Sequence, residues 1–249
     1  MFINNFDPVL LNLGPLEIRY YGLVYVLALI LLLLTLNYYR KKQVLTLTKE
    51  EVYDLVFYIG LGAILGARVF HVLFWGFSYY LANLLDLFAV WKGGMSFHGG
   101  VVGIALATYL YAKKKKINIA QLADMITLPI LVTLILGRIA NFFNHELYGT
   151  VTNLPWCVQF NNVDGCRHPY QLYASLKWLI VLLILLPLKN KKHGFIFWMF
   201  LLLTSIGRLV LDFVRVDTIY GGLKMGQWLS IGAILLSGYV LIKYYRSKE

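Results

Sequence analysis

Apolar residues along this chain gather in seven long runs, separated by short polar segments. At 1.5 Å of rise per helical residue, each run is long enough to cross a hydrocarbon core of roughly 30 Å. The pattern therefore predicts an all-α polytopic membrane protein with seven transmembrane helices. The predicted spans are Tyr21–Tyr39, Val52–Trp75, Met95–Ala112, Ile119–Phe143, Tyr170–Leu188, Gly194–Val214 and Met225–Ile242.

The composition agrees with a membrane protein. Of the 249 residues, 59% are hydrophobic and only 14% charged, and the mean hydropathy is +0.68. We expect a single integral membrane domain over residues 1–249, with an outer loop at about 144–169. The segment Gly76–Val90 is too short and interrupted to cross twice, which leaves an outer loop or an interfacial helix. The N-terminus has no basic region or cleavage site typical of a cleaved signal peptide.

Basic residues decide the expected orientation. Fourteen of the 23 Lys and Arg residues lie in four clusters, and with seven spans every cluster falls on one side of the membrane. The positive-inside rule then places the N-terminus outside and the C-terminus inside. The same clustering argues against nucleic acid as the partner of a chain with net charge +11. The clusters are Arg40, Lys41, Lys42 and Lys49; Lys113–Lys116; Lys189, Lys191 and Lys192; and Lys243, Arg246 and Lys248.

The stretch Gly137–Gly149, GRIANFFNHELYG, places polar side chains at the end of the fourth run. At about 100° per residue, Arg138, Asn141 and His145 share one face if the helix extends that far, and Glu146 lies close to it. An arginine at membrane depth costs roughly 2.5 to 3.5 kcal/mol on insertion scales, so it usually faces a bundle interior or a water-filled cavity. We interpret this stretch as one wall of a site.

A second polar stripe follows the sixth run. Thr204, Arg208, Asp212 and Arg215 are spaced like one helical face. Arg208 and Asp212 are predicted to form an ion pair. Alone, the stripe is explained by a structural pair with Arg215 reaching to the interface. Together with Arg138, two guanidinium groups indicate an anion, because guanidinium binds phosphate in a bidentate way.

GGMSFHGG, Gly93–Gly100, puts His98 among glycines at the start of the third run. His98 is either a general base or a hydrogen-bonded interior histidine. In the second case Gly99 and Gly103 form a small-residue packing surface, as do Gly62 and Gly66.

Other intramembrane residues stay ambiguous. Tyr21 fits an aromatic belt as well as a site, and Arg68 is expected to bind backbone carbonyls. Lys177 in the fifth run has no decided role. Cys157 and Cys166 share one loop, and their spacing leaves open whether they form a disulfide.

At these residues the chain resembles the bacterial prolipoprotein diacylglyceryl transferases. GRIANFFNHELYG matches every fixed position of that family's signature, G-R-x-x-N-F-x-N-x-E-x-x-G. FDPVLLNLGPLEIRYYGLVY, GGMSFHGG, RHPYQLY, RLVLDFVR and MGQWLSI are similar to its other motifs, so the resemblance extends over essentially the whole chain.

The resemblance implies an enzyme of the bacterial inner membrane that works toward the outer leaflet. It implies transfer of diacylglyceryl from phosphatidylglycerol to the lipobox cysteine of a prolipoprotein, with phosphatidylglycerol, prolipoprotein signal peptides and membrane lipid as partners. That reaction needs no metal or organic cofactor. Four residues are then expected to be catalytic: His98, Arg138, Arg208 and Tyr21. Substrate binding is expected of Arg138, Asn141, Glu146, Gly149 and Asp212.

The chain departs from the family pattern in three places. Asp212 stands where the family usually has glutamate, Ala174 replaces another glutamate, and the outer loop from Thr150 to Arg167 is short. From the residues alone, a small anion transporter or channel would also explain paired intramembrane arginines. A structural membrane scaffold leaves the polar face unexplained.

Overall fold

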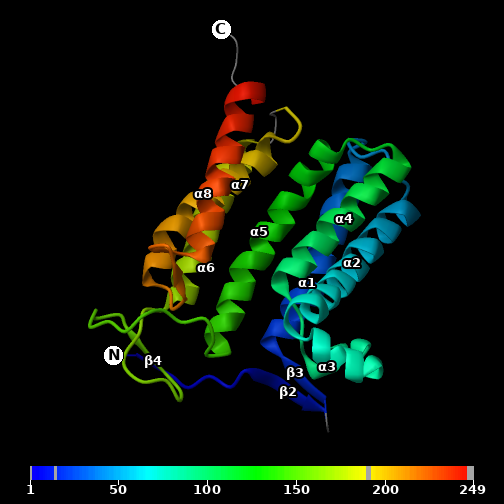
Figure 1. Ribbon diagram of the computed structural model, residues 1–249. Helices are drawn as coiled ribbons and strands as arrows, with labels where there is room; N and C mark the ends of the chain where they lie inside the picture. Colours follow the sequence, from blue (N-terminus) through cyan, green and yellow to red (C-terminus); the bar gives the residue numbers. More distant parts are fainter. Residues whose placement is uncertain (1, 14–15, 189–191, 246–249) are drawn as a thin grey trace. The chain divides into compact units, whose positions relative to one another are not determined.

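The computed structural model describes residues 2–13, 16–188 and 192–245 (Figure 1). Four basic residues of the predicted clusters, Lys189, Lys191, Arg246 and Lys248, lie outside the described residues. The described chain is mostly helical, which confirms a helical membrane protein. Six helices are long and apolar enough to cross a membrane: Tyr20–Lys41, Lys49–Trp75, Ile119–Phe143, Tyr170–Leu188, Phe195–Val214 and Met225–Tyr245.

The third expected span, Met95–Ala112, forms helix α4 (Phe97–Lys115). It is not among the six, because glycines at its start and lysines at its end lower its mean hydropathy. The count of seven spans therefore stays a prediction.

The chain forms two compact units. The first comprises Met1–Leu31 and Ala123–Glu249, and the second comprises Leu32–Leu122. Helix α1 (Tyr20–Lys41) contributes residues to both.

In the second unit, α2 (Lys49–Trp75) and α4 pack through glycines. A Cβ built on Gly62 would lie 2.6 Å from the carbonyl oxygen of Gly103. A Cβ built on Gly66 would lie 2.8 Å from the Cα of Gly103 and would also overlap the carbonyl oxygen of Gly99. Only hydrogen fits at these positions, so the predicted small-residue packing surface is confirmed.

Arg68 of α2 holds the segment that leads to α4. As expected, its guanidinium donates to backbone carbonyls, and the side chain is buried. Its acceptors are the carbonyl oxygens of Asp86, Leu87, Ala89, Gly93 and Gly94.

The segment that Arg68 holds is made of short helical turns, α3 (Phe77–Ala82), η1 (Leu84–Leu87) and η2 (Val90–Lys92). None of them is long enough to span a membrane, in agreement with the sequence. Five carbonyl acceptors on one guanidinium fix the approach of the chain to Gly93–Gly100.

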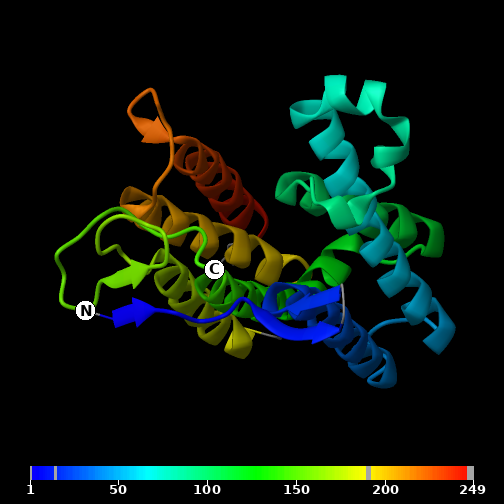
Figure 2. The ribbon, with the colours of Figure 1, turned by 90° about the horizontal axis from the view of Figure 1, so that it is seen from below.

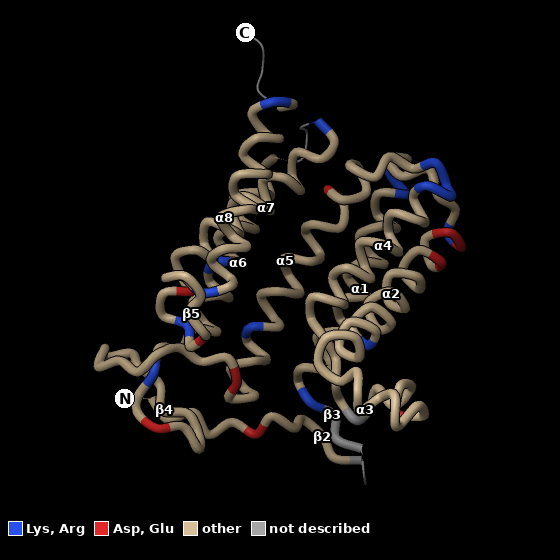
Figure 3. The backbone as a smooth tube through the Cα atoms, in the orientation of Figure 1, with Lys and Arg blue, Asp and Glu red and all other residues tan. Residues whose placement is uncertain are grey.

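Basic residues gather at helix ends within each unit (Figure 3). In the second unit, α1 ends in Arg40 and Lys41, and α4 ends in Lys113–Lys115. In the first unit, Lys243 lies in the last turn of the chain's final helix, η5 (Leu241–Tyr245). There the Tyr245 hydroxyl donates to the His193 carbonyl at 2.7 Å, beside Lys192.

The core of the first unit lies between α5 (Ile119–Phe143), α6 (Tyr170–Leu185) and α7 (Phe195–Leu211). Leu131, Val181, Leu185 and Ile196 form a buried cluster from these three helices. Helix α8 (Met225–Val240) packs against α7, and the 3₁₀ turn η3 (Leu186–Leu188) extends α6.

Three short strand pairs join the loops, and the sequence predicted none of them. β1 (Phe2–Asn4) pairs in parallel with β4 (Val158–Phe160), and Figure 2 shows this N-terminal strand beside the outer loop. The other pairs are antiparallel, β2 (Val9–Leu13) with β3 (Leu16–Arg19) and β5 (Ile219–Tyr220) with β6 (Leu223–Lys224). Strands this short carry too little alternation to be recognised in a sequence.

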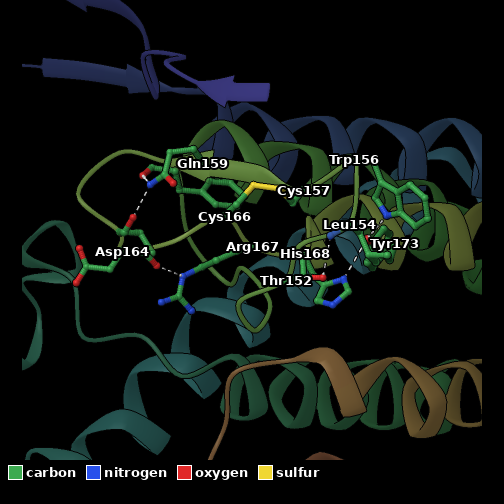
Figure 4. Close-up of a disulfide and its surroundings, with 12 residues drawn as sticks. Thr152, Leu154, Trp156, Cys157, Gln159, Asp164, Cys166, Arg167, His168 and Tyr173 are labelled. Carbon is green, nitrogen blue, oxygen red and sulfur yellow. Dashed lines mark hydrogen bonds between the residues drawn. A yellow bond between two sulfur atoms is a disulfide. The ribbon is translucent and has the colours of Figure 1, made fainter. Parts of the chain in front are cut away.

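The predicted outer loop connects α5 to α6, and it contains a disulfide between Cys157 and Cys166 (Figure 4). Their Cα atoms are 5.5 Å apart. The two cysteines are thus bridged, which their spacing in the sequence left undecided. The Trp156 indole donates to the Tyr173 hydroxyl at 2.7 Å, which ties this loop to the first turn of α6.

Candidate active site

An ion pair at the end of α7 lies at the centre of the site. Arg208 Nε is 3.3 Å from Asp212 Oδ2, which confirms the predicted pair. The Asp212 side chain is only 1% exposed, and its Oδ1 accepts a hydrogen bond of 2.7 Å from the Tyr170 hydroxyl. Two donors on different helices therefore satisfy a buried carboxylate, as a buried charge requires.

The predicted stripe on the sixth run does not continue as one helix. Helix α7 ends at Leu211, Asp212–Val214 forms a 3₁₀ turn (η4), and Arg215 is extended. The buried Lys224 stabilises this break by donating to three backbone carbonyls. Its Nζ lies 2.5 Å from the carbonyl oxygen of Asp212, 3.1 Å from that of Phe213 and 2.6 Å from that of Arg215. Sequence reasoning missed Lys224, because no periodic pattern marks a lysine that binds carbonyls.

The MGQWLSI motif supplies a close approach to the ion pair. A Cβ built on Gly226, in the first turn of α8, would lie 2.8 Å from Arg208 Nη2 and would overlap Asp212 Oδ2. Neither partner is at the free end of an unconstrained side chain, so a larger residue would displace the pair. Glycine at this position is explained by that contact.

Arg138 brings a second guanidinium to the cluster from α5. It interacts electrostatically with Arg208, Arg215, Tyr170 and Tyr21. Its Nη1 is buried and has no hydrogen-bond partner within the described part of the chain. A buried donor left unpaired costs about 1 to 3 kcal/mol. Its environment therefore favours an acceptor that a bound anion would supply.

The end of the signature stretch differs from the prediction. Helix α5 ends at Phe143, and His145 and Leu147 have left-handed backbone angles, with φ of 57° and 56°. The predicted helical face shared by Arg138, Asn141 and His145 is therefore wrong for His145. Its Nε2 instead lies 2.8 Å from the Phe6 carbonyl oxygen, in the N-terminal segment.

Glu146 is bonded to asparagines rather than to an arginine. Its Oε1 accepts hydrogen bonds from Asn141 at 2.7 Å and from Asn144 at 3.2 Å. Its backbone carbonyl accepts one from Gln171 of the RHPYQLY motif at 2.5 Å. Asn141 and Glu146, both expected to bind substrate, thus form one hydrogen-bonded pair that α6 holds in place.

Gly149, the last residue of the signature, lies where three chain segments meet. Its N–H donates to the His168 carbonyl at 2.9 Å, and it forms an antiparallel bridge with Arg215. A Cβ there would lie 2.6 Å from the Val214 carbonyl oxygen. Glycine is needed so that the loop can lie against the turn that follows Asp212.

Tyr21 and His98 belong to different units. Tyr21, at the start of α1, contacts Tyr25 edge to face with ring centroids 5.2 Å apart, and it interacts electrostatically with Arg138. His98 lies in the first turn of α4, which Ser96 caps by accepting from the Gly99 N–H at 3.3 Å. The expectation that His98 acts on the same substrate as the arginines stays a prediction.

Within the described residues, no group of three or more His, Cys, Asp and Glu side chains could hold a metal ion. Helices of spanning length that carry buried cationic side chains define the class of a helical membrane protein with a polar cluster among its spans.

The chain belongs to the prolipoprotein diacylglyceryl transferase family, whose family model matches residues 8–243. Its relatives include proteins named phosphatidylglycerol–prolipoprotein diacylglyceryl transferase. The one from Geobacter sulfurreducens is 40% identical, over 97% of this chain and 96% of its own length. Those from Bordetella avium and Pseudomonas aeruginosa (strain LESB58) are also 40% identical, over 95% and 94% of this chain and 93% and 90% of their own lengths.

We predict that Tyr170→Phe destabilises the protein, because it leaves one oxygen of the buried Asp212 carboxylate without its donor. The free energy of unfolding should fall by about 1 to 3 kcal/mol, measured by thermal or denaturant unfolding in detergent. Tyr173→Phe is the matched control, since the Tyr173 hydroxyl bonds the exposed Trp156. Equal stability of the two variants would contradict the role given to Tyr170.

Proposed function

We propose that this protein transfers the diacylglyceryl group of phosphatidylglycerol to the lipobox cysteine thiol of prolipoproteins, the first step of bacterial lipoprotein maturation. The observation that carries the proposal is Arg138, whose buried Nη1 has no hydrogen-bond partner among the described residues and which interacts electrostatically with Arg208. Two guanidinium groups suit a phosphodiester. Family membership supplies the reaction class.

The reaction exchanges one bond for another. The substrate thiol gives its proton to a base, and the thiolate attacks the glycerol carbon that carries the phosphate. A carbon–sulfur bond forms, the carbon–oxygen bond breaks, and glycerol phosphate leaves with the electron pair. His98 is the proposed base, since histidine is the side chain best suited to accept a proton near neutral pH.

The arginines bind the phosphoryl oxygens and stabilise the charge of the leaving group. Asp212 holds Arg208 in position at 3.3 Å. Tyr21 donates a hydrogen bond to the lipid head group. Asn141 and Glu146 form the polar wall beside Arg138, and Gly149 keeps that wall against the segment after Asp212.

The direct test combines purified protein, phosphatidylglycerol and a synthetic lipobox peptide. The peptide should gain the mass of one diacylglyceryl group while glycerol phosphate is released, and a peptide with serine in place of cysteine should gain nothing. Arg138→Ala should lower the rate by roughly 10² to 10³-fold, as expected for a donor lost from a transition state. Lys243→Gln, at an exposed position, is the charge-matched control.

Two results would contradict the proposed function. A near-normal rate for Arg138→Ala, inserted and folded like the parent, would remove the phosphate clamp. A folded, lipid-supplied protein that forms no product but moves phosphate anions across a vesicle membrane would favour an anion transporter.

The role of His98 has its own test. We expect His98→Gln to reduce the rate of thioether formation most at neutral pH and least at alkaline pH, where the thiol ionises without a base. The rate should be measured from pH 6 to 9, with His193→Gln as the control histidine. If His98→Gln keeps most of the parental rate across this range, His98 is not the base.

We also propose the topology: one integral domain of the inner membrane with seven spans, the N-terminus outside, the C-terminus inside and the site toward the outer leaflet. The basic clusters at helix ends support the orientation. The Cys157–Cys166 disulfide supports an outer position for its loop, because disulfides persist in oxidising compartments.

An odd number of spans places the two termini on opposite sides. A tag at the N-terminus should therefore be cut by protease added outside intact cells, while a C-terminal tag is protected until the membrane is opened. Termini on the same side would mean that α4 does not cross the membrane and that six spans are correct.

A further inference from the structure

An open groove follows the contact between α6 and α7 in the first unit. Its volume is about 490 Å³, within the range of small-molecule sites. Its walls come from every third or fourth residue of the two helices and are almost entirely apolar, with Ile180 and Ile184 on α6 and Leu203 and Val210 on α7. Because both helices have the length and composition of membrane spans, the groove has the hydrocarbon interior as its expected surroundings.

The groove begins beside the outer loop. Tyr173 lines that end, and its hydroxyl accepts the hydrogen bond from Trp156 of the loop. From Tyr173 to Ile184 the helix rises roughly 16 Å. That is about half of a hydrocarbon core of roughly 30 Å. The groove thus has the depth of one lipid leaflet.

Among the described residues that line the groove, Lys177 has the one charged side chain. Its stem lies against Gly207 of α7, where a Cβ would be 2.5 Å from the Lys177 Cδ. Its ammonium lies 3.5 Å from the centroid of the Trp178 ring. Among the described residues, no carboxylate or other hydrogen-bond acceptor contacts this ammonium. Glycine at position 207 therefore gives a cation room between two helices that otherwise present apolar surface.

Lys177 also joins the cluster of the site. It interacts electrostatically with Arg138 and Arg208, which repel it, and with Asp212, which attracts it. Three cations thus share one nearby buried carboxylate. An anion would offset this excess charge, and an apolar chain attached to that anion would lie in the groove below it.

We propose that the α6–α7 groove binds one acyl chain of the donor phosphatidylglycerol, with Lys177 facing the phosphate of the same lipid. This inference rests on the proposed function and names the helices between which the donor lipid enters. Lys177 is a specificity residue in this arrangement, because a zwitterionic lipid brings an extra positive charge to a site that already holds three. Arg138 and Arg208 bind the same phosphate from the other side.

Binding is tested without turnover. The full chain is placed in bilayers with phosphatidylglycerol that carries a photoactivatable acyl chain, and labelled peptides are mapped by mass spectrometry. Label should concentrate in Tyr170–Leu188 and Phe195–Leu211, and excess unlabelled phosphatidylglycerol should displace it about tenfold better than phosphatidylcholine does. Label spread evenly over all spans, or equal displacement by both lipids, would overturn the proposal.

Neighbouring positions on α6 provide a matched pair of variants. Ile180 lines the groove and Leu179 does not, although both side chains are about half exposed, at 49% and 41%. Ile180→Trp should fill the groove and raise the KM for phosphatidylglycerol roughly tenfold, equivalent to about 1.4 kcal/mol, with kcat within about twofold. Leu179→Trp should leave both constants unchanged. The same KM for both tryptophan variants would contradict an acyl chain in the groove.

The role of Lys177 in lipid specificity is tested by removing or keeping its charge in a side chain of similar length. Lys177→Met should abolish the preference for phosphatidylglycerol in the displacement experiment, whereas Lys177→Arg should retain it. A preference kept by Lys177→Met would exclude the role in specificity. Selective labelling by a protein that transfers nothing would refute the proposed function and leave the groove standing. Transfer without selective labelling would support the proposed function and refute acyl-chain binding in the groove.

Discussion

A carboxylate buried at the end of a membrane span is the constraint on which the site depends. An isolated charge at that depth is unstable unless it is paired and hydrogen-bonded. Asp212 meets this condition with Arg208 from its own helix and Tyr170 from α6. The arrangement holds only because Gly226 leaves room beside it and Lys224 satisfies the carbonyls of the broken helix. One buried charge therefore fixes the ends of α6, α7 and α8.

Around this pair, hydrogen bonds of the backbone place the rest of the signature. Gly149 lies against the turn after Asp212, and Gln171 binds the Glu146 carbonyl. The buried Asn4 donates to the Phe142 carbonyl at 2.8 Å, so the N-terminal strand also supports the end of α5. The residues after α5 are thus held as a hydrogen-bonded loop rather than as further helix. This loop brings Glu146 back to Asn141 at the end of α5. Arg138 lies one turn earlier on the same helix, and within the described residues its buried Nη1 has no hydrogen-bond partner.

In the second unit, a buried charge is stabilised by backbone carbonyls instead of an ion pair. The Arg68 guanidinium donates hydrogen bonds to five backbone carbonyls, and these stabilise the buried cation without any carboxylate. The chain that it holds leads directly to Ser96, which caps α4, and then to His98. Intramembrane arginines in this protein therefore have distinct roles. Arg68 donates to five carbonyls, Arg208 is held by Asp212, and the buried Nη1 of Arg138 has no hydrogen-bond partner among the described residues. That difference could not be inferred from their position in apolar runs.

The sequence by itself determined the membrane class, the approximate bounds of the spans and the Arg208–Asp212 pair, because hydropathy, helical periodicity and i to i+4 spacing are local properties. It named the glycines of α2 and α4 as a packing surface in only one of two interpretations, and the structure shows that packing. Only the tertiary structure decided that α5 stops at Phe143, that His145 turns to the N-terminal segment, and that Tyr170 and Lys224 complete the site. These contacts join residues far apart along the chain. Their partners are chosen by packing and by the need to satisfy buried polar groups, which no local pattern records.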